Sequence, residues 1–435
     1  MLVVQNVFVL FLLLLSIYFS LKKKHSIVLI IVVIGAINGP LLKIFGLALP
    51  FYYLSMIPLV ISKATNLEKG ILSFSIKSKE ATYPNMLVAL IFLAILSTYI
   101  IEKRIFVNEI LIQGFVGAFF RLIWLLLVMD LLKLLSTDSL LKLINIILFI
   151  LIFGNLVASL IQLFFGFPEV FYSLYYSPSV TPLSGPLRHG RFYRGYGLFP
   201  SPVNLGPAAV LLAAVSLSTR KYFSFFASLF MGLLSLSKSA ILGIPIVFFL
   251  WLISKILGIR GLNEKLNQSK KIALIIGTIL IVIFLPIFIN IMEQKGFFVS
   301  YYLNYLIKPT KALSSRYDVD NTNIWLAETY KVIEKYPLLG TGYTRIRNEN
   351  IGDSTYVVIL KQSGFIGLGI YLATMIGIVI YFIRKKRLFF LIPISTLIVG
   401  LGGNFLISFE HMFFVVVLML LQSKQCLTTN KINGF

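Results

Sequence analysis

Long apolar blocks separated by short polar stretches run along almost the whole chain. Most blocks hold about 17–25 residues, the length that an α-helix needs to cross a hydrocarbon core of roughly 30 Å. The short alternating segments of a membrane β-barrel and a repeat of fixed period are not visible in the sequence. The pattern therefore predicts an all-α polytopic membrane protein with roughly 12 transmembrane helices.

We interpret residues 1–435 as a single integral membrane domain. The first apolar block lacks the leading positive charges and the small-residue cleavage site of a signal peptide, so we expect it to be retained as a span. An apolar tail at 412–422 predicts a further crossing or a re-entrant segment. The other spans are expected near 2–20, 26–42, 46–62, 85–101, 105–129, 142–165, 199–218, 222–237, 239–257, 272–292, 354–383 and 388–408.

Composition agrees with this fold class. Hydrophobic residues make up 58% of the chain and charged residues only 13%, whereas soluble domains carry about 25% charged residues. The net charge of +23 has an ordinary cause, because cytoplasmic loops of membrane proteins collect Lys and Arg during insertion. We therefore expect membrane lipid as a partner and no nucleic acid.

Cysteine and histidine usage bears on cofactors. The single cysteine, Cys426, excludes an intramolecular disulfide and a thiolate metal cluster. No pair of His or Cys residues has metal-ligand spacing, and no phosphate-binding loop is present. We expect no metal and no other cofactor.

The basic clusters indicate how the spans are oriented in the membrane. If successive spans cross in alternating directions, all the clusters lie on the same side of the membrane, and the positive-inside rule identifies this side as cytoplasmic. Two large loops, 166–198 and 293–353, then fall on the extracytoplasmic side. The second contains 318–337, where apolar residues recur at helical spacing and predict an amphipathic helix on the bilayer surface or over the helix bundle. The basic clusters are 22–24, 63–79, 220–221, 255–271 and 384–387.

Half of the arginines lie in the two outer loops, against the insertion bias. A guanidinium binds phosphate bidentately and stays charged at any accessible pH. The alternative is interfacial anchoring, in which Arg and Tyr at a span end hold it at the lipid headgroups. We select Arg191 and Arg316 as catalytic candidates. The substrate-binding candidates are Arg188, Arg194, Tyr193, Tyr317, Arg345 and Arg347.

Carboxylates near these arginines are candidates to take a proton from an acceptor hydroxyl. Asp318 and Asp353 rank first because they flank the stretch that carries most of the motifs, ahead of Asp320 and Glu328. Asp353 and Ser354 also open a predicted span, where either residue is a good N-cap. Both interpretations of Asp353 stay open at this stage.

Short motifs follow one another in a fixed order in the second part of the chain. This ordered set resembles the O-antigen polymerase and O-antigen ligase superfamily of bacterial inner membranes, over roughly 185–383 by motif. After the arginine-rich loop come "FPSPVNLG" at 199–206, "SLSKSA" at 235–240, "SSRYD" at 314–318, Trp325, "YPLLGTGY" at 336–343 and "DSTYVVILKQSGFIGLGIY" at 353–371.

The resemblance implies a metal-independent glycosyltransferase of the bacterial cytoplasmic membrane with an outward-facing active site. Such enzymes transfer glycan from an undecaprenyl-diphosphate carrier to an acceptor hydroxyl. A polymerase joins lipid-linked repeat units into O-antigen or capsule, beside a flippase and a chain-length regulator. By match of position, the resemblance implies that Arg188, Arg191 or Arg194 in the first loop and Arg316 in the second lie near the diphosphate.

One departure favours the polymerase branch over the ligase branch. Ligases typically carry a histidine–asparagine pair where this chain has Asp353 and Ser354, which leaves the general base open. The alternatives are a ligase that transfers glycan to a lipid core and a transporter or lipid flippase. Transport predicts ionisable groups within the spans, and few are found; they are Arg121, Asp130, Lys238, Glu410 and His411.

Overall fold

The computed structural model describes most of the predicted spans and little of the two large loops. The described residues form two compact units, Met1–Phe92 with Phe106–Asn204 and Leu406–Phe435, and Leu93–Ile105 with Leu205–Phe405. We call them the first and the second unit. The described residues are 2–38, 40–44, 47–65, 81–102, 109–164, 188–189, 192–193, 195–199, 202–235, 237–259, 333–343, 354–402 and 408–432.

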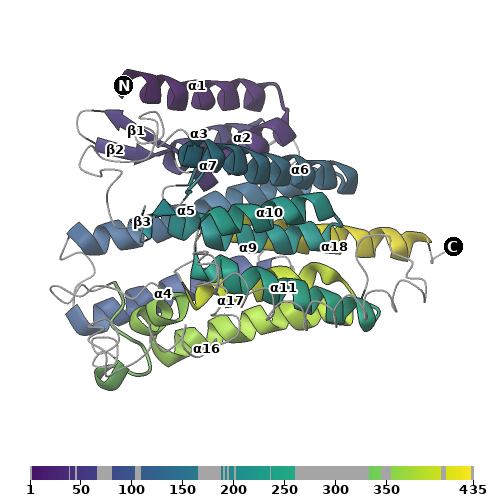
Figure 1. The fold of residues 1–435 in the computed structure, drawn as a ribbon. Coiled ribbons are helices and arrows are strands. Elements are labelled where there is room, and N and C mark those ends of the chain that lie inside the picture. Colours follow the sequence, from purple (N-terminus) through teal and green to yellow (C-terminus); the bar gives the residue numbers. More distant parts are fainter. Residues whose placement is uncertain are drawn as a thin grey trace. The chain divides into compact units, whose positions relative to one another are not determined.

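The first unit is built mainly from apolar helices, with two short hairpins (Figure 1). Its elements are α1 (Leu2–Leu21), α2 (His25–Asn38), β1 (Leu41–Ile44), β2 (Leu47–Pro50), α3 (Phe51–Ala64), the first half of α4 (Thr82–Glu102), α5 (Glu109–Leu134), α6 (Thr137–Phe149), the π-helix η3 (Ile150–Gly154), α7 (Asn155–Phe164), β3 (Arg188–His189), β4 (Phe192–Tyr193) and α18 (Phe409–Ile432). In both hairpins the strands pair antiparallel.

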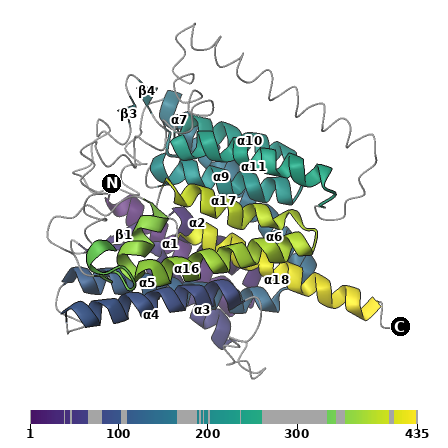
Figure 2. The same cartoon turned by 90° about the horizontal axis from the view of Figure 1, so that it is seen from below.

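The second unit contains the second half of α4 and helices from the middle and late parts of the chain. α17 packs between α11 and α16 (Figures 1 and 2). The hydroxyl of Ser218, at the end of α9, donates to the Leu388 carbonyl at 2.9 Å. The helices are α9 (Pro202–Ser218), α10 (Tyr222–Leu234), α11 (Lys238–Ile256), α16 (Thr355–Arg384), the 3-10 helix η5 (Leu388–Phe390) and α17 (Leu391–Gly400).

The predicted class of apolar helical protein is confirmed in its coarse form. Five helices of the described residues are long and apolar enough to cross a membrane, and others are apolar but shorter. The predicted count of about twelve spans is not established, and the span expected at 272–292 lies outside the described residues. The five long segments are Thr82–Ile101, Phe115–Leu134, Thr137–Leu163, Lys238–Ile256 and Thr355–Arg384.

The boundaries predicted around residue 42 are wrong. α2 ends at Asn38, and Leu41–Ile44 and Leu47–Pro50 pair as the strands β1 and β2 instead of forming the ends of two spans. Pro40 has no amide hydrogen and disfavours helical backbone before it, which explains the early end of α2. The Asn6 amide of α1 then pairs with the backbone of Lys43, accepting from its N–H at 2.9 Å and donating to its C=O at 2.6 Å.

Several other spans are longer than their apolar blocks indicate. α6, η3 and α7 continue into one another from Thr137, where the Ser136 hydroxyl accepts from the Ser139 N–H at 3.2 Å as an N-cap. The tail predicted at 412–422 belongs to the 24-residue helix α18. Polar residues extend both helices beyond the apolar pattern because caps and packing, not hydropathy, determine where a helix ends.

Basic residues tie the ends of three helices together in the first unit. The Lys63 ammonium of α3 lies 2.6 Å from the Asp130 carboxylate of α5. Lys424 of α18 donates to the carbonyls of Lys133, at 2.9 Å, and of Leu135, at the end of α5. Lysine at a helix C-terminus pairs favourably with the unsatisfied carbonyls there. These contacts place Lys63 and Lys424 at the same end of the first unit.

Candidate functional site

Most of the predicted site residues fall in the parts of the chain that the structure does not describe. For Arg188 and Tyr193 the structure describes the backbone. These two residues pair across the β3–β4 hairpin, next to the pair of His189 and Phe192. Of the predicted amphipathic helix at 318–337, only 333–337 is described, and 333–335 is helical. The residues outside the described ranges are Arg191, Arg194, Arg316, Tyr317, Asp318, Arg345, Arg347 and Asp353.

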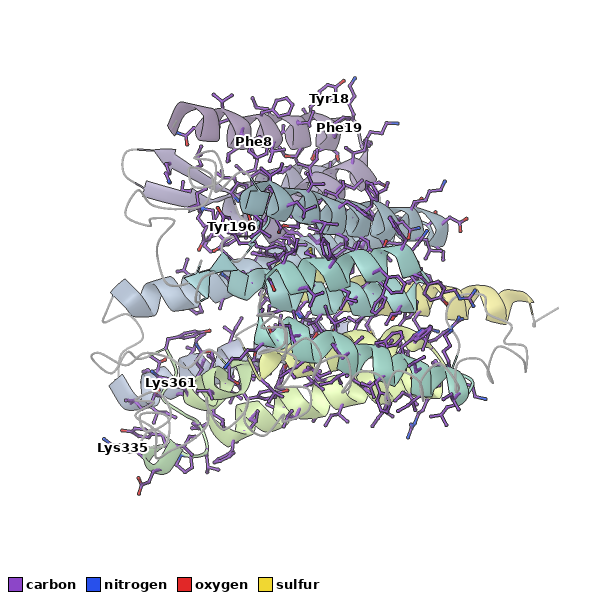
Figure 3. The ribbon with its side chains drawn as sticks, in the orientation of Figure 1. Phe8, Tyr18, Phe19, Tyr196, Lys335 and Lys361 are labelled. Carbon is purple, nitrogen blue, oxygen red and sulfur yellow. The ribbon has the colours of Figure 1, made fainter. Side chains whose placement is uncertain are left out.

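We call Arg188, Arg191 and Arg194 the first arginine cluster. The segment that directly follows it in the sequence is clamped by the side chain of Gln162 in α7. The Gln162 carbonyl oxygen accepts from the Tyr196 and Gly197 amides, each at 3.0 Å. Its amide nitrogen donates to the Gly197 carbonyl at 2.7 Å. Gln162 and Tyr196 are both buried, and Tyr196 is labelled in Figure 3. One side chain thus satisfies three neighbouring backbone groups two to three residues after Arg194.

Asn155 completes this clamp from the start of α7. Its side-chain oxygen accepts from the Leu198 amide at 2.7 Å, and its nitrogen donates to the Leu151 carbonyl inside η3 at 2.6 Å. Gly197 has φ +60°, and a Cβ there would lie 2.7 Å from the Asn155 oxygen. Only glycine fits this turn without strain. A π-helical turn often marks a functional position within a helix.

Two motifs that are apart in the sequence interlock in the second unit. α16 consists of two helical segments that meet at Gly364, whose backbone is non-helical. The break removes the helical bonds that the Phe365 and Ile366 amides would make to the Lys361 and Gln362 carbonyls. The turn at 336–343, which carries "YPLLGTGY", packs against this break.

The turn replaces each lost hydrogen bond. The Thr341 amide donates to Lys361 O at 2.6 Å, and the Gly342 amide donates to Gln362 O at 3.1 Å. On the other side of the break, the Phe365 amide donates to the Pro337 carbonyl at 2.9 Å and the Ile366 amide to the Leu338 carbonyl at 3.2 Å. Irregular backbone at membrane depth is tolerated when protein groups satisfy it in this way.

α4 holds the same turn from a second side. Ser97 donates its hydroxyl to the Leu339 carbonyl. The Thr98 hydroxyl accepts from the Tyr343 amide at 2.9 Å while donating to Ala94 O at 2.8 Å. Burial raises the pKa of the Tyr343 hydroxyl above its usual range, so this phenol stays neutral. The turn that precedes Arg345 is therefore fixed by two helices.

The start of α16 is fixed as well, directly after Asp353. Ser354 stands at the N-cap position, but its hydroxyl makes no capping bond and donates to Gly400 O at 3.0 Å. The Tyr356 hydroxyl donates to Leu397 O at 2.6 Å. Of the two N-cap candidates, Ser354 makes no side-chain cap, because the end of α17 offers a buried carbonyl that needs a donor. Asp353 itself lies outside the described residues.

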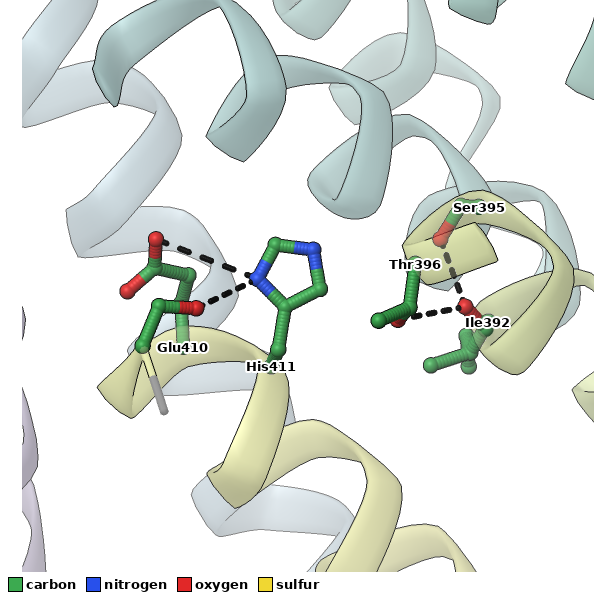
Figure 4. Close-up of polar contacts among 6 residues, drawn as sticks. Ile392, Ser395, Thr396, Glu410 and His411 are labelled. Atoms are coloured by element: carbon green, nitrogen blue, oxygen red, sulfur yellow. Dashed lines mark hydrogen bonds and ion pairs between the residues drawn. The ribbon is translucent and has the colours of Figure 1, made fainter. Parts of the chain in front are cut away.

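A buried polar cluster occupies the start of α18 in the first unit. Glu410 and His411 are 6% and 0% exposed, and His411 Nδ1 lies 3.9 Å from a Glu410 oxygen (Figure 4). Ser408 Oγ lies 2.7 Å from the same ring nitrogen. The Arg121 guanidinium of α5 lies 5.6 Å from the centres of the Tyr52 and Phe409 rings. Ionisable groups among apolar helices are costly, and they commonly mark a functional position.

Sequence reasoning missed Asn155 and Gln162 as site residues. They lie seven positions apart within an apolar block, which places two amides on one face of a helix. That spacing was the available signal, and only the structure identifies the backbone that they hold. Among the described residues, no group of three or more His, Cys, Asp or Glu side chains could hold a metal ion.

Comparison of the chain with protein-family models, with curated proteins and with solved structures finds no match. The functional argument therefore depends on the ordered motifs and on the chemistry of their residues. Two structural observations bear on it. "YPLLGTGY" and residues 361–366 of "DSTYVVILKQSGFIGLGIY" form one interlocked element, and the turn that follows Arg194 in the sequence is clamped.

Proposed function

We propose that this protein polymerises undecaprenyl-diphosphate-linked oligosaccharide repeat units into a surface polysaccharide, either O-antigen or capsule. The reaction is a metal-independent glycosyl transfer at the extracytoplasmic face of a bacterial cytoplasmic membrane. The observation that carries the proposal is the ordered motif set, two of whose members hydrogen-bond to each other in the second unit. Motifs that interlock in this way belong to one structural element, as a shared functional site requires.

In the proposed reaction, an acceptor hydroxyl oxygen forms a bond to the anomeric carbon of the donor sugar. The bond from that carbon to the diphosphate oxygen breaks, and undecaprenyl diphosphate leaves with the electron pair. Arg191 and Arg316 stabilise the negative charge that develops on the departing group, more strongly at a water-poor interface than in bulk water. Asp318 or Asp353 takes the acceptor proton.

The remaining candidates bind the two lipid-linked substrates. Further guanidinium groups that can bind the diphosphates bidentately belong to Arg188, Arg194, Arg345 and Arg347. Tyr193 and Tyr317 present apolar ring faces on which sugar rings stack. Because the donor is already activated, holding both substrates in a reactive orientation supplies much of the rate acceleration. A flippase that delivers the units and a chain-length regulator are the proposed protein partners.

Topology mapping tests the sidedness that this proposal needs. In a Cys426→Ser background, cysteines introduced as Arg191→Cys and Arg316→Cys are expected to react with a membrane-impermeant maleimide in intact cells. A Gln268→Cys control lies in the basic cluster at 255–271 and is expected to react only after lysis. Labelling of the two arginine positions only after lysis would place them in the cytosol and refute the proposed chemistry.

Transport is the second candidate function, and the buried cluster at the start of α18 favours it. Transporters place ionisable groups among their spans, as Arg121, Glu410 and His411 are placed here. The two functions differ in the leaflet where single repeat units accumulate in a deletion strain. A missing polymerase leaves them on the outer leaflet, and a missing flippase leaves them on the inner leaflet.

We expect accumulation on the outer leaflet, measured by the accessibility of the lipid-linked units to an added glycosidase in intact cells. Complementation with Glu410→Gln is expected to restore long chains, because the proposed reaction does not use this carboxyl. Accumulation on the inner leaflet, together with failure of Glu410→Gln to complement, would support transport in place of polymerisation.

A further inference from the structure

Gln162 is a buried polar residue within a long apolar helical segment. It lies near the end of the segment Thr137–Leu163, is 1% exposed, and directs its whole amide group to a loop 34–35 residues further along the chain. Glutamine is needed for this pattern because its amide has both an acceptor oxygen and donor hydrogens. The Gln162 amide thus makes its hydrogen bonds to the loop backbone and not to its own helix.

The clamped turn lies very close in sequence to the arginine cluster. Arg194 is two residues before Tyr196, so the backbone between them spans at most about 7 Å. The β3–β4 pairing of Arg188 with Tyr193 then ties the other end of the cluster to the same short segment. Arg191 stands in the sequence between the two paired strands. The clamp on Tyr196 and Gly197 therefore anchors the chain at a point two residues after Arg194 in the sequence.

We infer that Gln162, supported by Asn155, is a positioning residue for the first arginine cluster: it fixes the Tyr196–Leu198 backbone, which begins two residues after Arg194 in the sequence, relative to α7. Its chemical consequence, correct placement of the diphosphate, rests on the proposed function. Its structural consequence, an ordered backbone in the paired strands β3 and β4, does not rest on the proposed function. The two consequences are measured separately.

Three variants of one helix separate positioning from general stability. Gln162→Met keeps the side-chain length but removes the donor and the acceptor. Gln162→Glu keeps an acceptor for the Tyr196 and Gly197 amides and loses only the donor to Gly197 O. Ser159→Ala is the matched control, since Ser159 lies on α7 between the two clamp residues, is fully buried, and its hydroxyl has no hydrogen-bond partner in the structure.

The first readout is the mobility of the hairpin, independent of any activity. A nitroxide attached through His189→Cys, in a Cys426→Ser background, reports local order in a continuous-wave EPR spectrum of the purified full-length protein. We expect a broad, immobilised line shape for the parent and for Ser159→Ala, a sharper one for Gln162→Met, and an intermediate one for Gln162→Glu. Identical line shapes in parent and Gln162→Glu, or in parent and Gln162→Met, would overturn the inference.

The second readout is the rate of chain growth from purified lipid-linked repeat units. Gln162→Met is expected to lower kcat/KM about a hundred-fold, mainly through kcat, because small displacements of positioning groups have effects of that size. Gln162→Glu is expected to recover part of that loss. If the parent forms no polymer while the line shapes change as expected, the proposed function fails and the positioning role stands. If the parent forms polymer and Gln162→Met equals it, the positioning role fails.

Discussion

Arg191→Ala and Arg316→Ala are each expected to abolish long-chain glycan while leaving the protein inserted in the membrane. Both residues are proposed to stabilise the charge that develops on the departing diphosphate. Loss of one fixed donor at such a position typically slows a reaction by about 10²–10³-fold. A polymer of many units needs many successive transfers, so a slowdown of this size removes the long chains. Gel analysis of surface glycan, with immunoblotting of the membrane fraction, measures both outcomes.

Lysine substitutions sharpen this experiment. Arg191→Lys and Arg316→Lys keep the positive charge but lose the planar fork that contacts phosphate bidentately. We expect them to restore activity poorly. If interfacial anchoring were the main role of these arginines, the lysine variants would act like the parent, because lysine also extends to the headgroups. Normal chain lengths in both alanine variants would remove the arginines from the mechanism.

Gly364→Ala is expected to prevent stable folding of the second unit. Gly364 has φ +61° and ψ −162°, a region that is essentially open to glycine only. An added Cβ would lie 2.2 Å from the Leu338 carbonyl oxygen and 2.6 Å from the Leu339 amide nitrogen. The conformation alone costs about 1–3 kcal/mol, and the clash also separates the turn from the backbone groups that it satisfies.

The same helix supplies a matched control. A Cβ at Gly369 of α16 would meet nothing within 4 Å, so Gly369→Ala is expected to be neutral or to stabilise by up to about 1 kcal/mol through helix propensity. Thermal unfolding of the purified protein in detergent compares the two variants. Equal unfolding temperatures for Gly364→Ala and the parent would show that the interlock at the α16 break does not form.

Hydropathy was sufficient to predict where the apolar helices of the described residues lie, and insufficient to define their ends. The helices α10 and α11 begin within one residue of the predicted starts at 222 and 239, because each apolar block there begins next to basic or polar residues. The β1–β2 hairpin was missed, since its strands are nearly as apolar as a span and the interruption is marked only by Pro40, Gly46 and Pro50. Apolar content alone does not separate a buried strand from a helix end.

The sequence suggests candidate site residues by type, but it does not indicate the contacts that support them. Charge and the expected sidedness select arginines in two loops that are predicted to lie outside. The clamp by Gln162 and the repair of the α16 break by 337–342 depend on contacts between segments far apart in the sequence. No local pattern encodes which carbonyl a buried amide will meet, so such contacts become visible only in three dimensions.

Incubation of the purified protein with lipid-linked repeat units tests the central claim most directly. With no metal and no nucleotide sugar added, we expect a ladder of products that differ by one repeat unit, together with release of undecaprenyl diphosphate. The Arg191→Ala protein, purified in the same way, is expected to leave the units unchanged. Units that stay single with the parent protein, although it is folded and the lipid carriers are intact, would contradict the account.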